Sequence, residues 1–184
     1  MRVITGLGVL GIGLVGCGGA QLPSTADPLG EAVRIVSGVQ GSPEVIGCGD
    51  VHIVVYGSAD HHALIATIHG DLAADATTTG QPVLRQLPLP DADVDLRVVW
   101  GDHVSEPECN DVPSGATVIR GEALPISGNL ELEVIPDGYG TVDFPTGHAT
   151  LLLEDVVFED PITGVQRTLQ QLEAADVSIG WLPG

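Results

Sequence analysis

Apolar and polar residues alternate along much of the chain after its first thirty residues. In the stretch 93–100 every even-numbered position is apolar, and the first three odd-numbered positions are charged. Because successive side chains of an extended strand point to opposite faces, this period of two indicates a strand with one buried face. Many short runs of this kind, separated by Gly, Pro and Asp, predict an all-β antiparallel fold. We expect a β-sandwich, with a β-barrel as the alternative.

The expected elements are bounded by turn-forming residues. The runs that fit the strand pattern are 32–39, 51–56, 63–69, 83–87, 94–100, 117–121, 130–135, 140–144, 149–159, 165–169 and 176–181. Helical signal is confined to 71–76 and 168–175, and the second of these overlaps a strand run. We therefore expect at most one or two short helices.

The segment 50–69 predicts a β-hairpin with residues 57–62 as its loop. Pairing Tyr56 with Ala63 gives one wholly apolar face, whereas a slip of one residue mixes the two faces, so burial selects this register. The other pairs that follow are Val55–Leu64, Val54–Ile65, Ile53–Ala66, His52–Thr67, Val51–Ile68 and Asp50–His69.

Histidine and aspartate side chains gather at both ends of this hairpin. Imidazole together with carboxylate is a credible ligand set for zinc or copper. One candidate metal site consists of Asp50, His52 and His69, and a second, in the loop, consists of Asp60, His61 and His62. The first is favoured because strands hold ligands more rigidly than loops. The alternative is that these are ordinary surface histidines of an acidic protein that needs no cofactor.

The N-terminus combines Arg2, an apolar stretch 3–15 and the sequence Leu14-Val15-Gly16-Cys17. The apolar stretch is shorter than the roughly 20 residues that a membrane-spanning helix needs. The pattern resembles the lipobox signal peptide of bacterial lipoproteins. This resemblance implies cleavage before Cys17, lipidation of Cys17 and attachment to a membrane of the cell envelope. Gly18 in place of an aspartate favours the outer membrane over the inner membrane.

This assignment divides the chain into a cleaved signal peptide (1–16), a lipidated cysteine with a flexible tether (17–30) and a single β domain (31–184). With Cys17 assigned to lipid, Cys48 and Cys109 remain. Two cysteines in an exported chain most simply form one disulfide. A disulfide leaves no thiolate for catalysis or metal binding.

The chain is strongly acidic, with 25 Asp and Glu against 6 Lys and Arg and a net charge of −19. Such a field repels nucleic acid and anionic surfaces, which excludes nucleic acid as a partner. The Gly-x-Ser-x-Gly pattern of many hydrolases does not occur in the sequence, and no catalytic residue is assigned. We expect a non-enzymatic binding or structural module with a protein partner in the envelope or outside the cell. A metal-binding protein is the alternative, and a hydrolase is a distant third.

Overall fold

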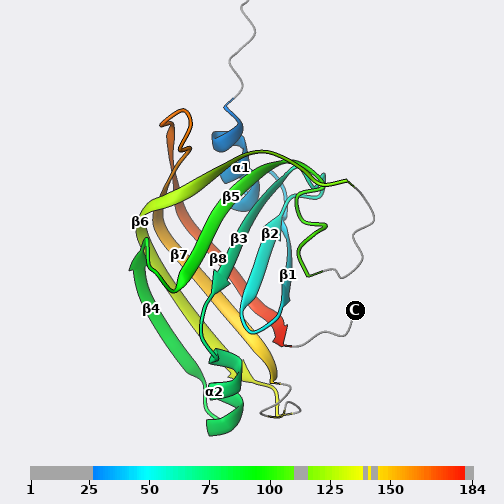
Figure 1. The fold of residues 1–184 in the computed structure, drawn as a ribbon, viewed down its shortest axis with the longest axis vertical. Helices are drawn as coiled ribbons and strands as arrows, with labels where there is room; N and C mark the ends of the chain where they lie inside the picture. Colours follow the sequence, from blue (N-terminus) through cyan, green and yellow to red (C-terminus); the bar gives the residue numbers. More distant parts are fainter. Residues whose placement is uncertain (1–26, 110–115, 139–140, 142–144, 181–184) are drawn as a thin grey trace, which may run out of the picture.

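The computed structural model describes residues 27–109, 116–138, 141 and 145–180. In this part of the chain the antiparallel strands form a single sheet, accompanied by two short helices (Figure 1). The helices are α1 (Pro28–Val36) and α2 (Leu72–Thr79). The strands are β1 (Glu44–Cys48), β2 (His52–Tyr56), β3 (His62–Ile68), β4 (Val83–Leu89), β5 (Val94–Asp102), β6 (Val118–Pro136), β7 (Thr146–Glu159) and β8 (Gln166–Gly180). The prediction of an all-β antiparallel fold with at most one or two short helices is confirmed.

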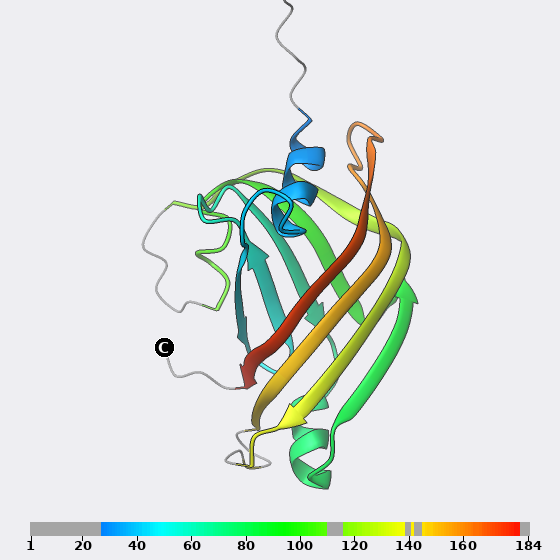
Figure 2. The ribbon, with the colours of Figure 1, turned by 180° about the vertical axis from the view of Figure 1, so that it is seen from behind.

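The sheet curls until its two end strands nearly meet, which gives a barrel-like shape (Figure 2). The strand order is β1-β2-β3-β5-β6-β7-β8, and β4 pairs with β6 outside this path. An antiparallel bridge joins Gly49 to Gly180 at the seam between β1 and β8. Gly47 lies against β8 there, and a Cβ atom at this position would lie 2.5 Å from the carbonyl oxygen of Ser178. The close approach of β1 to β8 therefore requires a residue without a side chain at position 47.

Strand β6 is long enough to pair with three other strands. Its first part pairs with β5 and its last part pairs with β4, while β7 runs along its other edge. The register to β7 shifts twice between Pro125 and Asn129. Gly128 lies at this point with a φ of +134°, close against the backbone of Val156. Bulges bend a strand, so these irregularities let one strand turn the corner of the sheet.

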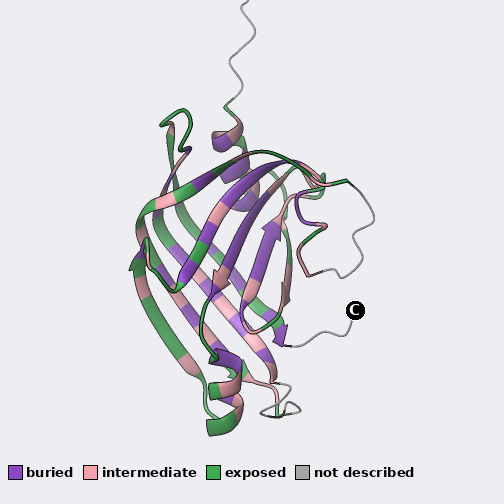
Figure 3. Cartoon of the chain, in the orientation of Figure 1, coloured by how far each residue is buried: buried purple, intermediate pink, exposed green. Residues whose placement is uncertain are grey.

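The inward-facing side chains of the strands and the apolar sides of both helices form one core. Figure 3 shows where the buried residues lie along the chain. Phe158 is the largest fully buried side chain. Helix α1 closes one end of the barrel-like sheet and α2 lies at the other (Figures 1 and 2). The interior is filled by side chains in the manner of a small barrel.

The hairpin prediction is confirmed in register as well as position. Strands β2 and β3 pair Tyr56 with Ala63 and His52 with Thr67. The apolar face, which includes Ile53, is buried in the core.

The predicted strand 32–39 is wrong, because this region forms helix α1. Its buried residues are Leu29, Ala32, Val33 and Val36, which is the spacing of one helical face. Asp27 caps the helix by accepting a hydrogen bond from the backbone N–H of Gly30, and Pro28 occupies the first turn. The helix includes residues 28–30, which the sequence placed at the end of the tether.

Other boundaries also differ from expectation. The predicted helix 168–175 is wrong, because β8 continues through it, whereas the predicted helix at 71–76 is confirmed as α2. The runs 117–121 and 130–135 belong to one strand, β6. The expected strand 140–144 lies almost entirely outside the described residues, as do the signal peptide and Cys17. Among the described residues, neither helix is long and apolar enough to span a membrane.

Candidate functional site

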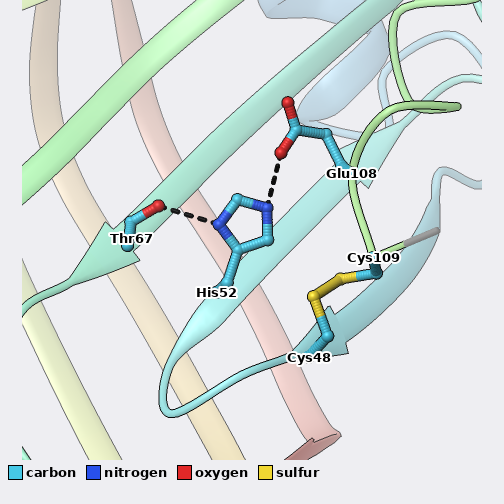
Figure 4. Close-up of a disulfide and its surroundings, with 5 residues drawn as sticks. All are labelled: Cys48, His52, Thr67, Glu108 and Cys109. Atoms are coloured by element: carbon cyan, nitrogen blue, oxygen red, sulfur yellow. Dashed lines mark hydrogen bonds and ion pairs between the residues drawn. A yellow bond between two sulfur atoms is a disulfide. The ribbon is translucent and has the colours of Figure 1, made fainter. Parts of the chain in front are cut away.

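A connected polar cluster lies on the outer face of β2, β3 and β5. The strand register aligns His52, Thr67 and Asp95 in one row across this face. The segment 103–109, which follows β5, folds back over the face and ends at a disulfide between Cys109 and Cys48 of β1 (Figure 4). The predicted disulfide is confirmed. It fastens a segment without helix or strand to an edge strand of the sheet.

His52 links this segment to the sheet. Its Nδ1 lies 2.8 Å from the hydroxyl oxygen of Thr67, and its Nε2 lies 2.7 Å from a carboxylate oxygen of Glu108 (Figure 4). An ionised carboxylate only accepts hydrogen bonds, so Nε2 donates to Glu108, and in the neutral ring Nδ1 accepts from Thr67. The guanidinium of Arg97 lies 3.6 Å from the other oxygen of Glu108. These contacts place the carboxylate between two cationic or hydrogen-donating partners.

The surroundings of Glu108 favour its charged form. The hydrogen bond from His52 lowers the pKa of Glu108, burial opposes this change, and the charges of His52 and Arg97 lower the pKa further. The side chains of His52 and Glu108 are only 18% and 17% exposed. The partly buried contact between His52 and Glu108 therefore holds the segment 103–109 against the sheet, and it is strongest while Glu108 is ionised.

A small apolar cluster lies under the same segment. Val104 is fully buried against Val54, Ile65 and Val99. This cluster is separate from the main core, and Val104 of the returning segment packs onto it together with the partly buried Ile46 and Tyr56. Apolar burial and polar contacts together hold the segment 103–109 in place.

Thr67, His52 and Glu108 contact one another in the order hydroxyl, imidazole, carboxylate. Nucleophilic hydrolases use groups in the same order. Both ring nitrogens of His52 are engaged in bridging two structural segments. Thr67, His52 and Glu108 line neither of the two surface grooves described below, although Asp95 and Arg97 beside them line one. We assign this cluster a structural role.

The first predicted metal set is not brought together. Asp50 accepts hydrogen bonds from the backbone N–H groups of Leu72 and Ala73, at 2.9 and 2.7 Å, and so caps the start of α2. Burial raises the pKa of Asp50, and these two hydrogen bonds oppose the rise. His69 lies 3.0 Å from Asp95, while His52 is engaged as described above. Each of the three residues has separate partners.

The second predicted set is also divided. His61 lies 3.0 Å from the carbonyl oxygen of Gly101 and 3.4 Å from a carboxylate oxygen of Asp102. His62 is half-buried in β3, and burial lowers its pKa. Asp60 instead faces the segment 103–109, where it lies close to His103 and Glu106.

Ligand-type side chains converge in two places among the described residues. One group joins His52 with Cys48 and Cys109, whose sulfurs are consumed by the disulfide. The other consists of Asp60, His103 and Glu106. The sequence did not indicate His103, Glu106 or Glu108, although all three lie within six residues of Cys109, whose disulfide fixes them over the hairpin.

Two surface grooves complete the geometry. One, of about 370 Å³, opens where β5 and β6 diverge, and combines apolar side chains with charged ones: Pro90, Val94, Asp95, Leu96, Arg97, Glu122, Leu124 and Pro125. Another, of about 420 Å³, lies beside the start of α1 and includes His61, His62, Asp102 and Arg120. Both are open surface features, which suits contact with a partner more than enclosure of a small molecule.

No protein-family model, curated protein or solved structure matches the chain.

Proposed function

We propose that this protein is a lipid-anchored module of the bacterial cell envelope with a non-enzymatic binding or structural role. The observation that carries the proposal is the sequence Leu14-Val15-Gly16-Cys17 after a short apolar stretch. The cysteine pairing supports it, because Cys48 and Cys109 bond to each other and Cys17 is the remaining cysteine. A structural disulfide is typical of exported chains.

The domain behind the anchor is suited to binding through its surface. Its interior is packed with side chains, and its grooves are open. A net charge of −19 favours partners that are neutral or cationic. We infer a protein partner in the envelope or outside the cell that approaches the exposed sheet and its loops.

The anchor is tested by mass spectrometry of the full-length protein expressed in a bacterium and recovered from the membrane fraction. We expect an N-terminal peptide that begins at Cys17 and carries a diacylglyceryl group. Cys17→Ser should leave the precursor uncleaved and without lipid, whereas the Cys48→Ser, Cys109→Ser variant serves as the control that retains the modification. Separation of inner and outer membranes on a density gradient tests the expected outer-membrane address. A parent protein with an unmodified Cys17 contradicts the proposal.

A further inference from the structure

We propose that Asp60, His103 and Glu106 form a binding site for a divalent transition-metal ion, with zinc as the representative ion. The three residues come from the β2–β3 loop and from the segment that follows β5. Each offers one ligand atom, and these atoms all lie within 4.8 Å of one another. An imidazole nitrogen with two carboxylate oxygens is a donor set that zinc accepts, with a water molecule completing the tetrahedron.

The distance between the ligand atoms of His103 and Glu106 matches the distance between two ligands of a zinc ion. Nδ1 of His103 and a carboxylate oxygen of Glu106 lie 3.2 Å apart. Two ligands of a tetrahedral zinc ion lie about 3.3 Å apart, because each is about 2.0–2.1 Å from the metal. One edge of the coordination tetrahedron is therefore already formed, and Asp60 needs to approach by no more than about 1.5 Å to complete the three-ligand set.

The backbone holds the two segments together at this point. The backbone N–H of Val104 donates to the carbonyl oxygen of Asp60 at 3.2 Å, and that of Ser105 donates to Oδ1 of Asp60 at 2.8 Å. The disulfide at Cys109 and the contacts of Glu108 fix the far end of the same segment. Ligands supported in this way are preorganised, which reduces the entropy lost on binding an ion.

Two of the three residues also have a left-handed backbone conformation. Asp60 and His103 have φ values of 52° and 53°, in the left-handed region. Residues other than glycine adopt this region uncommonly, and residues held in such conformations cluster at active sites and ligand-binding sites.

Charge favours a cation at this position. Two carboxylates approach each other in a chain whose net charge is −19. The carboxylate of Asp102, the residue before His103, has partners of its own: it is paired with the guanidinium of Arg120, and the imidazole of His61 also lies beside it. The side chain of Glu106 is 21% exposed, whereas that of His103 is 55% exposed, so an ion can enter from the solvent side of His103. A divalent ion would relieve the repulsion between the carboxylates.

The test is calorimetric titration of the purified, oxidised protein with zinc chloride. We expect one zinc ion per chain. His103→Asn and Glu106→Gln should each weaken zinc binding at least about tenfold, since even the loss of an outer partner of a ligand costs about 10–100-fold. Asn tolerates the left-handed backbone of position 103, and Gln keeps the size of Glu106. His61→Ala and His69→Ala, which alter the two sets expected from sequence, are the matched controls and should bind as the parent does.

A second measurement is independent of variant folding. In the unaltered protein, the imidazole NMR signals of His103 should shift as one equivalent of zinc is added. The proposal is overturned if the parent binds no zinc, if His103→Asn binds zinc as tightly as the parent, or if the shifted signals belong to another histidine.

Discussion

The disulfide between Cys48 and Cys109 should supply a large part of the stability of the domain. It joins residues 61 positions apart in the sequence. In the chain-entropy model, closing a loop of this length removes about 4 kcal/mol of conformational freedom from the unfolded chain. Domains of ordinary stability unfold with about 5–15 kcal/mol. The Cys48→Ala, Cys109→Ala variant should therefore lose about 4 kcal/mol of unfolding free energy.

Urea denaturation followed by circular dichroism measures this loss. The parent protein in excess dithiol reductant is the matched control, because it breaks the same bond without changing a residue. Both samples should show a lower midpoint than the oxidised parent, by a similar amount. A loss below about 1 kcal/mol in both would refute the reasoning, because it would show that the unfolded chain is not restrained by the bond to the extent that the loop length implies.

Three further predictions concern the contact between β1 and β8, the contact between His52 and Glu108, and the core. Gly47→Val should destabilise the domain by about 1–3 kcal/mol, because its side chain would collide with β8; an unchanged thermal midpoint would show that the seam is open. The lowered pKa of Glu108 means that its contribution is fully present above its ordinary pKa of about 4.3 and is lost as the pH falls through the lower folded value. Glu108→Gln should therefore reduce stability at neutral pH and flatten the acid limb of a stability-versus-pH curve; two parallel curves would contradict this. Phe158→Ala should cost about 3–5 kcal/mol by chemical denaturation, since Phe158 is fully buried; a loss under 1 kcal/mol would mean that the core refills the space.

The hairpin was predictable because its information is local. Burial of Ile53 and its neighbours selects one parity for the whole β2–β3 pair, and the structure has that register. The all-β fold class was predictable for the same reason, because each run of alternating apolar and polar residues indicates a strand with one buried face. Whether the sheet curls into a barrel-like shape depends on contacts such as Gly47 against Ser178, which no local pattern contains.

The polar sites were not predictable for a related reason. The histidines were placed on the right face of the hairpin, but their partners come from distant segments: His52 contacts Glu108 and His69 contacts Asp95. Asp50 was expected as a ligand and instead caps α2. Helix α1 was mistaken for a strand because its run of apolar residues is too short for period alone to separate the two.

The position of α1 also sets where the N-terminal segment joins the domain. Its cap, Asp27, is paired with Arg167 of β8, so the first described residue is fixed to the body of the domain. If Cys17 carries lipid, the nine residues between Cys17 and α1's cap span at most about 35 Å at 3.3–3.6 Å per residue. Such an anchor would then join the domain at the end closed by α1, which is also the end of the β7–β8 loop, where Ile162 is 87% exposed. Helix α2, at the opposite end of the sheet, would be the element farthest from the attachment point, so an anchor of this length would leave that end open to the aqueous side (Figure 1).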